Sequence, residues 1–78
     1  MRVIKEFPFS DSIKASVFTW NGKYILKLEC GGLEQSYKIS ELEISGEAEL
    51  MEYCRNPKFI NRVLQVFSMM EDTWPPEA

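Results

Sequence analysis

Two short turns constrain this chain more than any other feature of its sequence. Asn21-Gly22 interrupts an alternating stretch at 13–30. A two-residue type I′ turn needs positive φ at both central positions, which Asn-Gly provides at little steric cost. If these residues close the turn, the residue numbers of each cross-strand pair add up to 43. A second turn at Gly31-Gly32 gives pairs whose residue numbers add up to 63. The sequence therefore predicts a three-stranded antiparallel meander in a fixed register.

Side chains alternate between the two faces of this predicted sheet. One face is mainly apolar and is the expected core face: Ile13, Ala15, Val17, Thr19, Tyr24, Leu26, Leu28, Cys30, Leu33, Gln35, Tyr37 and Ile39. The opposite face is polar except near the first turn, where Phe18, Trp20 and Ile25 occupy neighbouring positions. Because both turns place the apolar residues on the same face, register and burial pattern agree.

The rest of the chain predicts a further strand and two helices. Residues 2–7 are expected to join the sheet at an edge, ahead of a turn at 8–12, in a register that the sequence leaves open. Ser45 is the expected N-cap of a short helix. Asn56-Pro57 predicts the start of a longer amphipathic helix, which runs to about residue 72 and buries its apolar stripe against the face that carries Leu26 and Leu28.

These elements predict an α+β fold: an antiparallel β-meander of three to four strands, then a short helix and a longer amphipathic C-terminal helix packed on one sheet face. We expect a single domain over residues 1–78. The meander occupies 1–39, a mainly helical part 40–74, and a tail 75–78.

The missing residue types exclude several kinds of chemistry. The chain has no histidine, which rules out Ser-His-Asp and Cys-His catalysis and an imidazole base. Neither a GxGxxG nor a GxxxxGK[ST] motif occurs. Glu47, Glu49 and Glu52 suit a solvated helix start rather than a catalytic carboxylate pair. Cys30 and Cys54 form no CxxC and have no histidine to complete a zinc set. We expect no enzyme activity, no catalytic residue, no cofactor and no metal.

Charge and size bear on location and on partners. The net charge is -3, with +2 over residues 1–39 and -5 over residues 40–78. Charged residues near the start leave no signal-peptide core, and no apolar run reaches the length of a membrane span. We therefore expect a soluble, cytoplasmic protein that does not bind membranes. At 78 residues the core is small, so a partner subunit would add stability.

The aromatic end of the polar face allows two functional interpretations. The favoured one is protein association, with a second copy or with another protein, because aromatic residues are enriched at interface hot spots. The first strand or the extended sheet edge could also pair with a second copy. The alternative is single-stranded nucleic acid, with Phe18 and Trp20 stacking on bases and nearby lysines contacting phosphates. These lysines are Lys14, Lys23, Lys27 and Lys38. The acidic sequence pI of about 4.9 argues against this alternative.

A third interpretation assigns no ligand to this end of the sheet. The aromatic side chains would then be covered within the monomer, and Trp20 would serve only in packing. The candidate covering residues are Leu42 and Ile44, Phe7 and Phe9, or Trp74.

The stretch FTWNGKYILKLECGGLEQSYKISELEISGE, residues 18–47, contains WNGKY and LEQSYK. It resembles a family of small uncharacterised bacterial proteins that share a W-N-x-[KR]-Y hairpin, an L-E-Q-x-[FY]-K strand and a C-terminal helix. The resemblance extends over most of the chain and implies no activity and no site residue. The expected order of four strands and a helix also resembles the whirly-like repeat of PUR-type nucleic-acid-binding proteins in topology alone, without their motifs.

Overall fold

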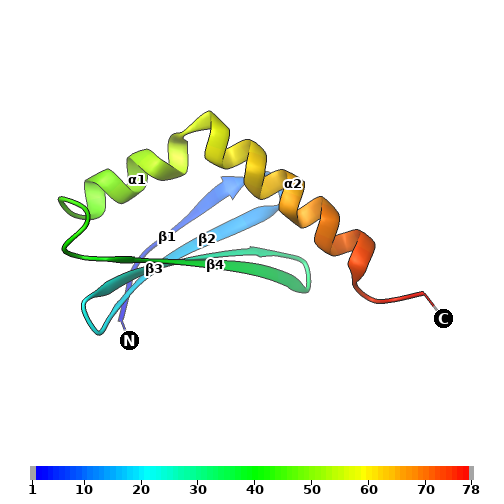
Figure 1. The fold of residues 1–78 in the computed structure, drawn as a ribbon, viewed down its shortest axis with the longest axis horizontal. Coiled ribbons are helices and arrows are strands. Elements are labelled where there is room, and N and C mark those ends of the chain that lie inside the picture. The colour runs from blue at the N-terminus through cyan, green and yellow to red at the C-terminus, as the bar shows by residue number, and fades with distance from the viewer. Residues whose placement is uncertain (1, 78) are drawn as a thin grey trace.

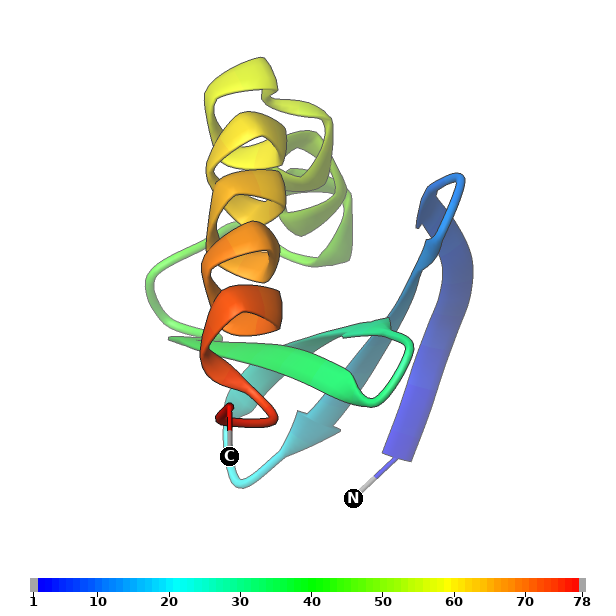
Figure 2. The same ribbon diagram turned by 90° about the vertical axis from the view of Figure 1, so that its right-hand side faces the viewer.

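The computed structural model describes residues 2–77 and contains one four-stranded antiparallel sheet and two helices (Figure 1). The elements are β1 (Arg2–Ser10), β2 (Ile13–Trp20), β3 (Lys23–Cys30), β4 (Leu33–Ser40), α1 (Glu47–Arg55) and α2 (Pro57–Thr73). Each strand pairs with its neighbour in sequence. Both helices lie on one face of the sheet, here called the inner face, and leave the outer face without a helix (Figure 2). The predicted α+β fold is confirmed.

The register of the meander is the predicted one. Trp20 pairs with Lys23 across the Asn21-Gly22 turn, where the two turn residues have φ of 55° and 74°. Cys30 pairs with Leu33 across the second turn. The two-residue turns therefore set the face of every side chain from β2 to β4.

β1 is longer and less regular than expected. It runs through Pro8, so that the turn lies at 11–12. Bulges at Ile4 and Phe9 shift its pairing with β2. The first bulge decides which of two adjacent apolar residues is buried, because Ile4 packs against the core whereas Val3 is 49% exposed. A bulge sets two consecutive residues against one partner, so simple alternation could not predict this register.

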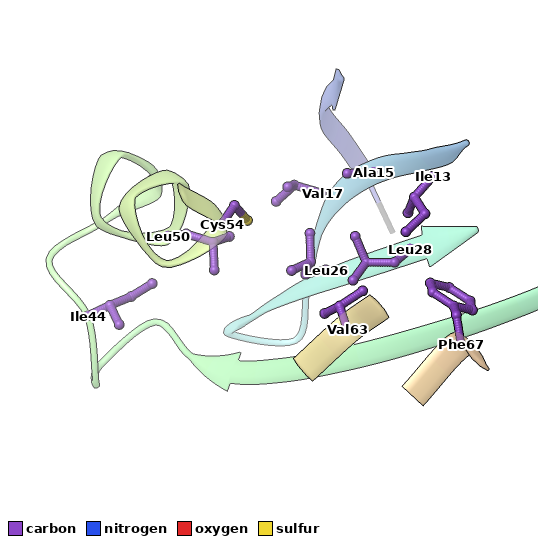
Figure 3. Packing of buried hydrophobic residues seen from close by; sticks show 10 residues of the cluster. All are labelled: Ile13, Ala15, Val17, Leu26, Leu28, Ile44, Leu50, Cys54, Val63 and Phe67. Carbon is purple, nitrogen blue, oxygen red and sulfur yellow. The ribbon is translucent and has the colours of Figure 1, made fainter. Parts of the chain in front are cut away.

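The hydrophobic core lies between the inner face and the helices (Figure 3). Its buried residues are Ile13, Ala15, Val17, Leu26, Leu28, Ile44, Leu50, Cys54, Val63 and Phe67. Leu28 and Val17 of the sheet and Val63 of α2 are the largest side chains that are fully buried. The amphipathic stripe of α2 therefore packs on the predicted core face. Within residues 2–77, neither helix is long and apolar enough to cross a membrane.

The start of α1 corrects the expected N-cap. The N-cap position belongs to Gly46, whose φ of 144° favours glycine, and not to Ser45. Ser45 instead donates its backbone N–H and its hydroxyl to Oε2 of Glu49, at 2.9 and 3.0 Å. At the start of α2, the Asn56 side chain accepts the N–H of Lys58 at 2.9 Å, as expected of an N-cap.

Candidate functional site

Apolar side chains gather at one end of the outer face, and we call Val3, Phe18, Trp20 and Ile25 the outer-face patch. Phe18 pairs with Val3 on one side and with Ile25 on the other, and directly opposed residues project to the same face. Trp20 follows two positions along β2 and is 51% exposed, whereas Ile25 is only 8% exposed. The patch thus combines a nearly buried aliphatic side chain with an accessible indole ring.

The patch borders an open hollow of about 340 Å³ on the outer face. Its lining residues are Phe18, Trp20, Ile25, Lys27, Glu34, Ser36 and Lys38. Five of the predicted site residues therefore surround one concave surface. Lys23 lies beside this group as the partner of Trp20, and Lys14 lies at the opposite end of the hairpin as the partner of Glu29. Val3 was not among the predicted site residues, since the bulge in β1 sets its face.

The residues expected to cover the patch lie elsewhere. Ile44 belongs to the core on the inner face, where Phe7 and Phe9 also pack. Leu42 is 96% exposed, so it covers nothing. Trp74 is 66% exposed and precedes the C-terminus, which lies at the opposite end of the sheet from the cyan turn between β2 and β3 (Figure 1). None of these proposed covers occupies the patch within residues 2–77.

Charges of both signs lie along the outer face. Nζ of Lys14 lies 3.7 Å from a carboxylate oxygen of Glu6. Nζ of Lys27 lies 3.5 Å from Glu29 and 3.8 Å from Glu34. Lys14 does stand opposite Glu29 in the predicted register, but its ion pair forms with β1, whose register the sequence left open. Carboxylates on the same face therefore offset much of the positive charge of these lysines.

Lys23 and Lys38 differ from the other outer-face lysines. Both are exposed, and neither forms an ion pair within 4 Å among the residues that the structure describes. They flank the aromatic end of the face, since Lys23 pairs with Trp20 and Lys38 pairs with Ile25. The two outer-face lysines without an ion pair thus lie next to the patch.

A second cavity, of about 310 Å³, lies between β4 and the helices. It is lined by Leu26, Tyr37, Lys38, Ile39, Leu50, Tyr53, Asn56 and Phe59. The Tyr37 and Phe59 rings meet edge to face, with centroids 5.6 Å apart.

Burial raises the pKa of the nearby Cys54 thiol, which disfavours the reactive thiolate. Within residues 2–77, no three potential ligands cluster as a metal site would require.

No family model, curated protein or solved structure matches this sequence. The functional interpretation therefore rests on the surfaces described above.

Proposed function

We propose that this protein is a non-enzymatic association module that binds another protein through the outer-face patch. The observation that carries the proposal is the 51% exposure of Trp20 beside the nearly buried Ile25. An accessible indole next to other apolar side chains offers a partner a large area for desolvation without rearrangement of the sheet. Hot spots of protein interfaces have this composition, with polar residues at the rim.

The charges beside the patch suggest the chemistry of the partner. Lys23 and Lys38 stand free next to the aromatic residues, whereas Lys14 and Lys27 already contact glutamates. A complementary surface would place an apolar side chain in the hollow and carboxylates opposite the two free lysines. We therefore propose a partner with an apolar anchor and an acidic rim.

Single-stranded nucleic acid is the second candidate, favoured by aromatic and basic side chains on one sheet face. The ion pairs of Lys14 and Lys27 count against it, because phosphates would compete with carboxylates already in place. Lys27→Glu should weaken oligonucleotide binding and leave protein association nearly unchanged. Binding that falls steeply as salt rises, through release of counterions, would favour nucleic acid.

We also propose that the protein is cytoplasmic. Cys30 and Cys54 are both free thiols. Thiols persist in reducing compartments, whereas small secreted domains tend to be cross-linked by disulfides.

Two exposed tryptophans provide a matched test. Trp20→Ser alters the patch, and Trp74→Ser removes an indole that is 66% exposed near the other end of the molecule. Quantitative affinity capture from an extract of the source organism should identify a protein retained by the wild type and by Trp74→Ser. Titration calorimetry with that purified partner should show at least about a tenfold loss of affinity for Trp20→Ser, as expected for a hot-spot aromatic.

Stability measurements separate loss of an interface from loss of the fold. Trp20→Ser should lower the free energy of unfolding of the monomer by less than about 1 kcal/mol, since large losses come from buried side chains. A loss of about 3 kcal/mol or more is the scale for deleting a buried aromatic side chain and would make Trp20 a packing residue. Equal partner binding by both variants would also contradict the proposed function.

A further inference from the structure

The two edges of the sheet differ in their ability to accept another strand. β1 carries Pro8, which has no N–H, and two bulges; natural sheets use both devices to block edge pairing. β4 has neither, and it pairs without a register shift along its whole length, with β3 alone. In Figure 1 both helices lie above β4, and no strand pairs with β4 on the side away from β3 within residues 2–77. The β4 edge is therefore regular and open.

The register shows which backbone groups this edge presents. Cys30 and Leu33 flank a two-residue turn and form a hydrogen-bonded pair, so the odd-numbered residues of β4 bond to β3. The N–H and C=O groups of Glu34, Ser36 and Lys38 consequently point away from the sheet. No strand of residues 2–77 lies beside them. They form a short row of donors and acceptors without a partner strand.

The side chains of β4 are complementary to themselves about Ser36. At equal distances on either side of Ser36 stand Gln35 and Tyr37, Glu34 and Lys38, and Leu33 and Ile39. If two copies of β4 pair antiparallel about a twofold axis at Ser36, each residue faces the other member of its couple. Glu34 then meets Lys38 of the second copy on the outer face, and Leu33 meets Ile39 on the inner face. Cross-strand pairs of these kinds stabilise antiparallel sheets.

Other registers are less favourable. A twofold axis at Gln35 or at Tyr37 would also align the outward backbone groups, but it would set Glu34 and Lys38 opposite uncharged residues. A twofold axis at Glu34 or at Lys38 would bring two like charges face to face, which is destabilising. The axis at Ser36 aligns the free backbone groups and also pairs opposite charges.

We infer that β4 is a homodimerisation edge. Two copies pair antiparallel through β4, centred on Ser36, to form one continuous sheet. Three pairs then exchange two N–H···O bonds each. Glu34 of each copy pairs with Lys38 of the other, and the two Ser36 residues pair with each other. Tyr37, which is 41% exposed at this edge, gains a neighbour in Gln35 of the second copy. Glu34, Ser36 and Lys38 also line the outer-face hollow, so this edge adjoins the outer-face patch. None of the four patch residues lies on β4, and the inference does not depend on the proposed function.

Charge reversal tests both the dimer and its register. In Glu34→Lys alone, Lys faces Lys across the dimer, and in Lys38→Glu alone, Glu faces Glu. Sedimentation equilibrium should give twice the monomer mass of 9.1 kDa for the wild type at millimolar concentration. Each single variant should dimerise at least about tenfold more weakly. An equimolar mixture of the two variants should dimerise again, because each unlike pair then joins opposite charges.

A backbone test is independent of charge. Ser36→Pro removes the central N–H and should abolish the dimer, whereas Ser36→Ala keeps that N–H and should retain it. Hydrogen exchange followed by NMR should show that protection of the Glu34, Ser36 and Lys38 amides increases with protein concentration. A wild type that remains monomeric at millimolar concentration would overturn the inference, as would single charge variants that dimerise normally.

The two surfaces are distinguished by their own variants. Trp20→Ser should leave the β4 dimer intact. If Trp20→Ser dissolves a dimer that both charge variants still form, the copies associate through the outer-face patch instead. That result would overturn the β4 inference and leave the proposed function standing. Loss of partner binding without loss of the dimer would support both.

Discussion

At the scale of single residues, Gln35 is a buried polar side chain that links the sheet to α2. It is 7% exposed, and its Nε2 donates to the backbone C=O of Val63 at 3.1 Å. Its Oε1 accepts the Tyr37 hydroxyl. Burial of an amide is costly unless it is hydrogen-bonded. Within residues 2–77, no buried side-chain nitrogen or oxygen lacks a partner, so this link holds β4 to α2 without an unsatisfied group.

Removal of the Tyr37 hydroxyl tests this link. Tyr37→Phe should lower the free energy of unfolding by about 1 kcal/mol, because Gln35 Oε1 loses its donor at a buried site. Urea denaturation at a protein concentration low enough to keep the chain monomeric measures the difference. Tyr53→Phe is the matched control, since Tyr53 donates to Glu49 at an exposed position and its loss should have no measurable effect. Equal effects of the two substitutions would assign Gln35 no role.

At the scale of elements, prediction succeeds where a local rule sets geometry. A two-residue turn determines both the pairing and the faces of its flanking strands, so the positions of Phe18, Trp20 and Ile25 could be derived from sequence. The bulge at Ile4 follows no such rule, because it depends on how β1 fits against β2 and the helices. The ion pair of Lys14 with Glu6 and the place of Val3 in the patch were unpredictable for the same reason.

The turn segment before α1 shows a second limit. Leu42 and Ile44 were both candidate covers of the aromatic side chains on the outer face, but the chain leaves the strand after Ser40. Ile44 is 7% exposed in the core, whereas Leu42 is 96% exposed. Side-chain direction in a turn depends on individual backbone angles rather than on a period of two. In the same segment, the predicted N-cap Ser45 lies one position before the observed N-cap Gly46.

The start of α1 carries a pH-dependent interaction. The backbone N–H of Ser45, and then its hydroxyl, lower the pKa of the Glu49 carboxyl from its ordinary value of 4.5. A carboxyl whose pKa is depressed on folding stabilises the fold above its unfolded pKa, and this contribution is lost as pH falls through the folded pKa. Carbon-13 NMR titration should give Glu49 a midpoint below the ordinary value of 4.5. Ser45→Ala should raise that midpoint, and an unchanged midpoint would contradict the hydroxyl contribution.

At the scale of the whole molecule, a helix layer covers the inner face and leaves two unprotected surfaces. The outer-face patch exposes Trp20, and the β4 edge exposes unpaired backbone groups. A 78-residue chain has a small hydrophobic core and a low net stability. The free energy of contacts made by either surface is therefore large relative to its free energy of unfolding. Pairing through β4 extends the sheet sideways and leaves Trp20 of each copy accessible. In the dimer Lys38 faces Glu34 of the second copy, so Lys23 is the lysine that remains for the acidic rim of a partner.

Stability that depends on concentration follows from the β4 dimer. Association that requires folded chains stabilises them by mass action, so the melting temperature rises with protein concentration. Above the dissociation constant, a tenfold increase in concentration contributes about 0.7 kcal/mol per chain to folding. For a domain of this size, that corresponds to a rise in melting temperature of roughly 3–6 °C per tenfold increase in concentration.

Lys38→Glu should melt at a temperature that is independent of concentration over the same range, because like charges oppose its pairing. The equimolar mixture of Glu34→Lys and Lys38→Glu should recover the wild-type slope. Equal slopes for the wild type and Lys38→Glu would mean that any self-association of the folded chain uses a surface other than β4.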